Sequence, residues 1–272
     1  MDSLVSNYVS FNEFVELFLY GIVFSTILSL KEIRSFLAST DLRQAILTEA
    51  EPRLLNRIRI PRVSNRIWWL IVCLWLMSLW LSTMPTFSIL GLLSSLTLYF
   101  FVFSRIWSLH FVLKKTSLIP CYLGLFLIYR CLELLPNLNL DESAWIASKA
   151  ILASVYLGAG MHKIKVWWRR PGYLNALQGH LAVSALLRNT KVSGVLIQYP
   201  ALCRWIFLLT IVWEITMPVI CVFPGAVSLV YGVMGLGFHL GTLIVMRIDY
   251  LRFYWPVYMV FLADLKLVLG FY

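Results

Sequence analysis

Three ionisable residues with side chains suited to proton transfer stand in or beside long apolar stretches of this sequence: Lys163, Glu214 and His239. Glu214 follows Arg204 by ten residues and His239 precedes Arg247 by eight, so helices rising about 1.5 Å per residue would place both at a similar depth. Ionisable groups inside a membrane are costly and usually face the interior of a helix bundle. A carboxylate and an imidazole at one depth either handle a proton or ion together or form a structural pair that locks two helices.

Lys163 lies in the stretch YLGAGMHKIKVWWRRPG, which runs from Tyr156 to Gly172. The small residues before Lys163 are typical of helices that pack closely in membranes. The Trp and Arg pairs at 167–170 are typical of anchors at a membrane surface. Two interpretations follow: the Lys163 amine anchors a helix end among lipid headgroups, or it points into the bundle and acts as a base.

A second group of ionisable residues lies toward the opposite ends of the apolar stretches. Arg130 and Glu133 have the i,i+3 spacing of an ion pair within one helix. The other members of this group are Lys149, Asp264, Lys266, Glu13 and Glu16. These acids and bases either neutralise one another structurally or line a polar chamber that admits a substrate from outside.

Composition assigns the chain to the membrane proteins. Of its 272 residues 60% are hydrophobic and 13% charged, far from the average of soluble domains. The net charge of +10 comes from short basic clusters between apolar stretches, which indicates contacts with lipid headgroups and not with nucleic acid. The five cysteines lack CxxC spacing and are expected to be small buried hydrophobic residues, not disulfides or zinc ligands.

The apolar stretches predict an all-α, polytopic transmembrane helix bundle that forms a single domain over residues 1–272. A membrane span needs about 20 mostly apolar residues. About eight are predicted, at 11–30, 67–84, 87–111, 117–135, 144–162, 204–223, 225–246 and 253–272. The more polar segments 31–66 and 163–203 are each expected to hold an amphipathic helix at the membrane interface.

The distribution of Lys and Arg predicts the orientation of this multi-pass chain. Cytoplasmic loops carry an excess of basic residues. When both termini are placed on the non-cytoplasmic side of the lipid bilayer, the basic segments all lie on the cytoplasmic side. The connections on the non-cytoplasmic side then hold no Lys or Arg.

Three motifs in the order YLGAGMHKIKVWW, WEITMP and FHLGTLIVMRIDYLRFYWPVYM resemble the horizontally transferred transmembrane domain (HTTM) family, whose best known member is the vitamin K-dependent gamma-glutamyl carboxylase. The resemblance covers mainly residues 150–265. The first family motif is matched by Tyr156, Ala159, Gly160, Lys163 and Trp167 or Trp168. The two later motifs are matched by Glu214 with Pro218 and by Phe238, His239 and Gly241.

The resemblance implies that Lys163 is the base that deprotonates a hydroquinone, which would make a quinone or hydroquinone the cofactor. A lysine can act so only when it is uncharged, and this requires a dry pocket. In this sequence Lys163 is followed by the basic residues Lys165, Arg169 and Arg170. The chain also leaves no room for the large soluble domain that grips the carboxylase substrate, so full carboxylase activity is not expected of this chain alone.

Three classes of function remain open at this point. The first is a membrane enzyme or enzyme subunit that acts on a lipophilic quinone-like cofactor or matures a small substrate, with Lys163 as base and Glu214 and His239 handling protons. The second is a non-catalytic scaffold subunit bound to membrane or soluble protein partners, and the third is a transporter. No metal is expected, because His180 lacks a suitably spaced partner.

Overall fold

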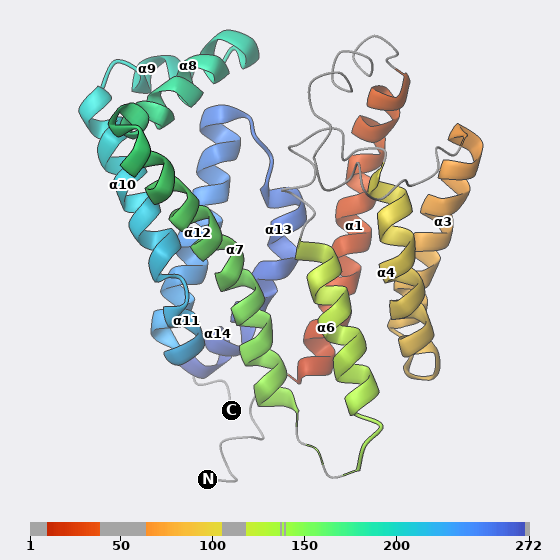
Figure 1. The fold of residues 1–272 in the computed structure, drawn as a ribbon. Helices are drawn as coiled ribbons and strands as arrows, with labels where there is room; N and C mark the ends of the chain where they lie inside the picture. Colours follow the sequence, from red (N-terminus) through yellow and green to blue (C-terminus); the bar gives the residue numbers. More distant parts are fainter. Residues whose placement is uncertain (1–9, 39–63, 105–117, 137, 139, 270–272) are drawn as a thin grey trace. The chain divides into compact units, whose positions relative to one another are not determined.

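The computed structural model describes residues 10–38, 64–104, 118–136, 138 and 140–269. Every regular element in these ranges is a helix, and no strand occurs among them. The all-α prediction is therefore confirmed for the described part of the chain (Figure 1).

The chain divides into two compact units. The N-terminal unit comprises residues 10–144, and the C-terminal unit comprises residues 145–272 together with residues 1–9. The boundary falls within a helix, α7 (Asp141–Arg169), and not in a linker. The single transmembrane domain expected over 1–272 stays a prediction.

The N-terminal unit is built from four long helices and one short turn of helix. They are α1 (Phe11–Ala38), α3 (Asn65–Ser82), η3 (Pro85–Phe87), α4 (Ser88–Ser104) and α6 (Leu118–Leu132). The buried residues of α1 recur at helical spacing, which gives the helix one packed face. They are Phe11, Phe14, Val15, Phe18, Leu19 and Ile22. Aromatic rings on this face contact rings of α6, and Phe18 stacks on Tyr122 with centroids 5.0 Å apart.

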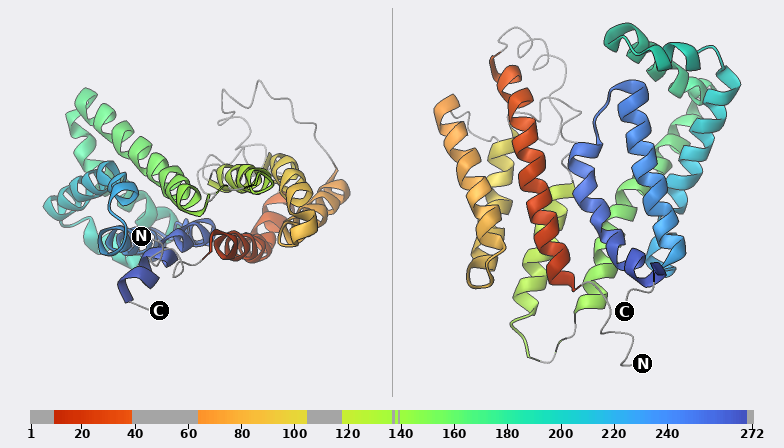
Figure 2. Two further views of the ribbon diagram at one scale, coloured as in Figure 1. Left: turned by 90° about the horizontal axis from the view of Figure 1, so that it is seen from below. Right: turned by 180° about the vertical axis from the view of Figure 1, so that it is seen from behind.

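Helices α3 and α4 form an antiparallel hairpin, which both views in Figure 2 show side by side. Pro85 lies in the tight turn between them. Two tryptophans of α3 each donate an indole N–H to a backbone carbonyl of α4. Trp68 donates to Val102 and Trp75 to Ser95, each over 3.0 Å.

The C-terminal unit contains the remaining helices, of which α7, α10 and α12 are the longest. In chain order they are α7, η4 (Pro171–Asn175), α8 (Ala176–Arg188), α9 (Lys191–Leu196), α10 (Pro200–Thr216), α11 (Val219–Val222), α12 (Ala226–Met246), α13 (Leu251–Tyr258), η5 (Met259–Phe261) and α14 (Leu262–Leu269). Figure 1 shows α8 and α9 at the end of this unit where α10 begins and α12 finishes. Helix α8 packs against α9, α10 and α12.

Five helical stretches are long and apolar enough to cross a membrane. They are Phe11–Leu30, Pro85–Phe103, Asp141–Arg169, Pro200–Val222 and Ala226–Met246. Shorter apolar helices at Arg66–Ser82 and Leu118–Leu132 coincide with two further predicted spans. Part of the predicted span 87–111 lies outside the described residues.

The last predicted span, 253–272, is not one continuous helix in the residues described. It is divided into α13, η5 and α14, and residues 270–272 lie outside the described part. Pro256 lies inside α13, where its missing N–H removes a helical hydrogen bond. A hydropathy pattern detects the apolar stretch but not this interruption.

The polar segment 163–203 holds the helices α8 and α9. Their position at a membrane interface stays a prediction. Its first residues instead continue α7 to Arg169. In the segment 31–66, residues 31–38 continue α1, while residues 39–63 lie outside the described part of the chain.

The cysteines correct one expectation from the sequence. None of the five forms a disulfide among the described residues, as predicted. Only Cys203 is buried, whereas Cys73, Cys121 and Cys131 are exposed on apolar helices and Cys221 is half-buried. A thiol is apolar enough to face lipid, so an apolar neighbourhood in the sequence does not require burial against protein.

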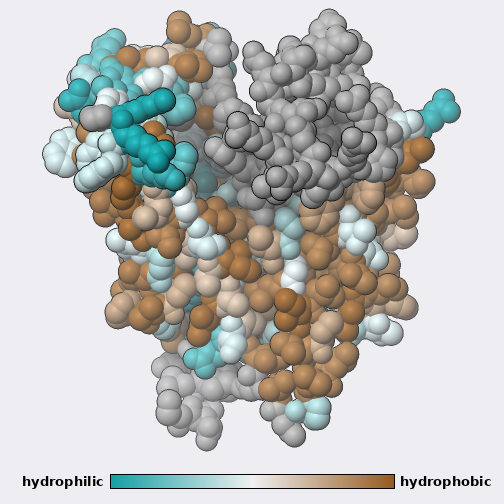
Figure 3. Space-filling model, in the orientation of Figure 1, coloured by the Kyte–Doolittle hydropathy of each residue, from teal (hydrophilic) through white to brown (hydrophobic). Residues whose placement is uncertain are grey.

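The outer surface is largely hydrophobic. Figure 3 shows hydrophobic side chains over much of the visible flank and hydrophilic ones gathered at the end of the C-terminal unit that carries α8. Large apolar side chains such as Leu209, Val212 and Val233 are more than half exposed. Such a surface is typical of helices that contact lipid.

Candidate functional site

The candidate site begins where α7 approaches α10 at Gly160. A Cβ atom on this buried glycine would lie 2.9 Å from Ile215 Cγ1 and 3.1 Å from Glu214 Cβ. Only glycine allows this separation, so Gly160 sets how closely the two helices pack. A Cβ atom on Gly158 would have no atom within 4 Å. Of these two glycines in the small-residue stretch, Gly160 is therefore the one at the close contact between α7 and α10.

Lys163 lies nearly one turn beyond Gly160 on α7 and forms an ion pair with Glu214 of α10. The Glu214 side chain is 4% exposed and that of Lys163 is 22% exposed. Helical side chains point back toward the N-terminus of their helix, which directs the Lys163 amine toward the level of Gly160. The amine therefore lies against an acid inside the helix bundle, whereas Trp168 at the helix end is 88% exposed.

Local sequence explains why α7 extends far enough to carry Lys163. Asp141 and Glu142 lie in its first turn and Arg169 in its last, which matches the charge preference of each end of a helix dipole. Pro171 follows, and the chain turns into η4. The helix runs 29 residues and thus reaches beyond the predicted span 144–162.

Three buried polar side chains form a hydrogen-bonded chain between α7, α12 and α13. The Tyr156 hydroxyl lies 2.6 Å from His239 Nε2 and 2.5 Å from the Tyr258 hydroxyl. A Cβ on Gly235 would lie 2.2 Å from that Tyr258 hydroxyl, so glycine is required on α12 at this point. This group is called the Tyr–His chain below.

Aromatic rings surround the Tyr–His chain. The Trp213 ring centroid lies 4.8 Å from that of Tyr156 and 5.6 Å from that of Phe238. The Tyr254 ring lies 4.7 Å from the His239 ring. Tyr156 contacts Trp213, and Gly160, four residues further along α7, contacts Glu214. The aromatic wall and the Lys163–Glu214 pair therefore lie within about two helical turns of α7.

Three buried polar atoms in this region have no hydrogen-bond partner within the described part of the chain. They are Glu214 Oε2, His239 Nδ1 and Trp213 Nε1. Buried polar groups in native proteins are nearly always paired with protein, water or ligand. These three atoms therefore keep hydrogen-bonding capacity beside the aromatic rings.

The structure brings the three predicted site residues into one unit but pairs them differently from the prediction. Glu214 and His239 were expected to meet; instead Glu214 contacts Lys163, and His239 contacts Tyr156. No role for Tyr258 was predicted from the sequence. Tyr156 did have a signal in the sequence, because it precedes Lys163 by seven residues, and this spacing places both side chains on one face of a helix.

The second predicted group contains a separate buried cluster in the C-terminal unit. The Lys149 amine lies 2.8 Å from both Asp264 carboxylate oxygens. The same carboxylate accepts from the Gly225 backbone N–H and the Ser228 hydroxyl, each over 2.8 Å. Every oxygen of Asp264 is therefore engaged, which supports the structural interpretation for this pair.

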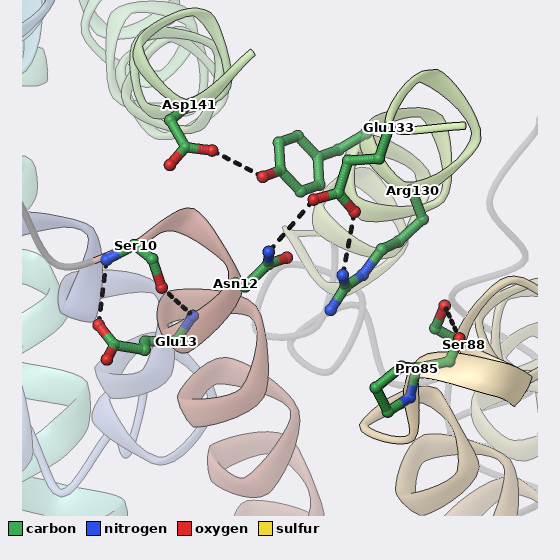
Figure 4. A network of polar contacts seen from close by, with 9 residues as sticks. Ser10, Asn12, Glu13, Pro85, Ser88, Arg130, Glu133 and Asp141 are labelled. Carbon is green, nitrogen blue, oxygen red and sulfur yellow. Dashed lines mark hydrogen bonds and ion pairs between the residues drawn. The ribbon is translucent and has the colours of Figure 1, made fainter. Parts of the chain in front are cut away.

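Lys266 lies on α14 of the C-terminal unit, and Glu16 lies on α1 of the N-terminal unit. The other three members, Arg130, Glu133 and Glu13, also lie in the N-terminal unit (Figure 4). Arg130 and Glu133 form the predicted i,i+3 pair at 3.0 Å, and Asn12 donates to Glu133 over 3.2 Å. Glu13 accepts from the Ser10 N–H, and Ser10 Oγ accepts from the Glu13 N–H. This reciprocal pattern is a capping box that begins α1, so these charges also have structural roles.

Two further histidines lie in the described part of the chain, and both are exposed: His162 on α7 and His180 on α8. His110 lies outside the described residues. Among the residues that the structure describes, no group of three or more His, Cys, Asp or Glu side chains is placed to hold a metal ion.

Comparison with protein-family models, with curated proteins and with solved structures finds no match for this chain. The resemblance to the HTTM family therefore depends on the motif residues. The structure adds their positions: Gly160 and Lys163 of the first motif contact Glu214 of the second, and Tyr156 contacts His239 of the third.

Proposed function

We propose that this chain is a multi-pass membrane enzyme, or an enzyme subunit, that acts on a lipophilic quinone or hydroquinone in its C-terminal unit. The observation that carries the proposal is the Lys163–Glu214 pair beside the aromatic wall. The HTTM resemblance supports the same assignment. Of the unpaired atoms, Trp213 Nε1 can donate to a ring oxygen, and Glu214 Oε2 can accept from a hydroquinone hydroxyl. His239 Nδ1 is also unpaired.

The residues of this site would divide the proton transfers between them. When bound, a hydroquinone would supply an acidic hydroxyl and two electrons, with molecular oxygen as the oxidant that takes the electrons. Lys163 can accept that proton only as a neutral amine, and Glu214 is placed to take the ammonium proton across the ion pair. The Tyr–His chain offers a second route for a proton within the same unit.

The topology forms part of the proposal. Eight spans result when the two shorter apolar helices and the interrupted α13–α14 segment are added to the five long apolar stretches. The positive-inside rule then places both termini on the non-cytoplasmic side of the lipid bilayer.

The test compares K163R with K165R in lipid nanodiscs supplied with vitamin K hydroquinone. K163R keeps the charge but removes a side chain that can act as a neutral base. General-base catalysis contributes roughly 10²–10⁴-fold, so oxygen uptake should fall at least tenfold in K163R. Lys165 is exposed two residues away, and K165R should keep the wild-type rate. Equal rates in wild type and K163R would remove the catalytic assignment.

The scaffold function remains the second candidate, because the Lys163–Glu214 pair can also hold α7 against α10 structurally. Native mass spectrometry after gentle extraction separates the two functions. A retained quinone supports the enzyme, while stoichiometric protein partners without a cofactor support the scaffold.

A further inference from the structure

The Tyr–His chain has a preferred direction, which follows from counting donors. A tyrosine hydroxyl has one hydrogen to donate, and a neutral imidazole carries a hydrogen on one nitrogen only. Tyr156 lies between His239 Nε2 and the Tyr258 hydroxyl. No other hydrogen bond of Tyr156, Tyr258 or the His239 ring is present in the described part of the chain.

In one direction, Tyr258 donates to Tyr156 and Tyr156 donates to His239 Nε2. Every hydroxyl hydrogen is then used, and the imidazole hydrogen is on Nδ1. In the opposite direction, His239 Nε2–H donates to Tyr156 and Tyr156 donates to Tyr258, which leaves the Tyr258 hydrogen without an acceptor. The first direction leaves one buried group unpaired, the Nδ1–H of His239. The opposite direction leaves two, the Tyr258 hydroxyl hydrogen and the lone pair of His239 Nδ1. Because unpaired buried polar groups are unfavourable, the first direction is preferred.

We infer that His239 presents its Nδ1–H as a hydrogen-bond donor to a ligand, and that the ligand offers a carbonyl-type acceptor oxygen. Three observations lead to this inference: the donor direction of the chain, the 3% exposure of His239, and the absence of any partner for Nδ1 among the described residues. Tyr156 is a positioning residue, because it fixes which ring nitrogen carries the hydrogen.

The inference rests on the proposed function for the location of the ligand, but the donor assignment is independent of it. A carbonyl oxygen near His239 has two sources in a membrane. One is a quinone, and the other is the ester group of a phospholipid. Both accept a hydrogen bond from Nδ1–H in the same way, so the experiment has to vary them separately.

The experiment records ¹⁵N spectra of histidine-labelled protein in nanodiscs made from ether-linked phospholipids, which have no carbonyl. The substitutions H110N, H162N and H180N leave His239 as the sole histidine. We expect a neutral ring with its hydrogen on Nδ1. In Y156F the ring loses the contact that fixes the tautomer, so signals of both tautomers should appear. Y199F alters an exposed tyrosine and should leave the spectrum unchanged. A hydrogen on Nε2 in the unsubstituted site would overturn the inference.

The ligand is then varied in two arms. Menadione is added to the ether-lipid nanodiscs, or the ether lipids are replaced by ester-linked ones. A downfield shift of the Nδ1 resonance with menadione supports both the inference and the proposed function. A shift with ester lipids alone supports the donor role and removes the quinone. No shift in either arm overturns the assignment of His239 as a ligand donor.

Discussion

Helix α7 carries two lysines that each pair with an acid on a later helix, yet the two pairs differ in how completely their acids are bonded. Lys149 meets Asp264, whose carboxylate also accepts from Gly225 and Ser228. Lys163 meets Glu214, whose Oε2 has no partner in the described part of the chain. A buried acid with every oxygen engaged is a structural connection, whereas one with a free oxygen retains capacity for a ligand or a proton.

The two pairs also differ in how far their side chains are exposed. Both partners of the Lys149–Asp264 pair are at least nine-tenths buried, while the Lys163 side chain is 22% exposed. A fully enclosed pair cannot exchange protons without opening the fold. Lys163 is less completely enclosed, so proton exchange at the Lys163–Glu214 pair does not require the fold to open.

The largest effect on stability is expected at the fully bonded pair. D264N leaves the Lys149 charge buried without its counter-charge, and such a loss typically costs about 3–5 kcal/mol. The measurement is the free energy of unfolding by SDS titration in mixed micelles. D249N breaks a partly exposed i,i+3 pair with Arg252 and should cost about 0.2–1 kcal/mol. Similar losses in the two variants would mean that the Asp264 cluster has no special structural role.

A smaller loss of stability and a larger loss of activity are expected at Glu214. E214Q removes the counter-charge of Lys163, whose amine is partly exposed, so the cost should be nearer about 1–3 kcal/mol. Hydroquinone-dependent oxygen uptake should nevertheless fall at least tenfold, because the acid that receives the Lys163 proton is gone. If E214Q destabilises the protein as much as D264N while activity per folded molecule persists, the contrast between the pairs is wrong.

The close contact that brings the site together can be changed without altering any charge. G160A places a Cβ 2.9 Å from Ile215 Cγ1, and overpacking of this kind costs about 1–3 kcal/mol. G158A is the matched control, because nothing lies within 4 Å of its added atom. Replacing a helical glycine by alanine stabilises a helix by up to about 1 kcal/mol. Thermal melting of the two variants should therefore shift in opposite directions, and equal shifts would show that α7 and α10 are not in close contact at Gly160.

Much of the fold could be predicted from the sequence because lipid imposes long apolar stretches. The stretches near 11–30, 204–223 and 225–246 correspond to α1, α10 with α11, and α12. The interruption at 253–272 could not be found in this way, since mean hydropathy does not register the geometry of Pro256. The prediction that all five cysteines are buried was wrong for three of them for a related reason. Hydropathy does not distinguish a lipid-facing side chain from a protein-facing one.

The candidate site was found in part because charges are rare in apolar sequence. Lys163, Glu214 and His239 were noticeable for that reason, and the structure brings all three into one unit. Counting residues along a helix gives the depth of a side chain but not the direction in which it points. Glu214 and His239 were therefore matched by depth, while the actual partners are Lys163 and Tyr156. Tyr258 was missed because tyrosine is common in membrane proteins.

The central claim is that a ligand binds beside Glu214 and His239, where polar atoms lack hydrogen-bond partners, and not at the Asp264 cluster. Photoaffinity labelling with an azido-quinone in nanodiscs, followed by peptide mass spectrometry, tests it most directly. The account predicts labelling of the peptides that carry Trp213 with Glu214 and Phe238 with His239, with loss of the label when unmodified quinone is added in excess. Label confined to the peptides around Ser228 and Asp264, or label that excess quinone does not displace, would contradict it.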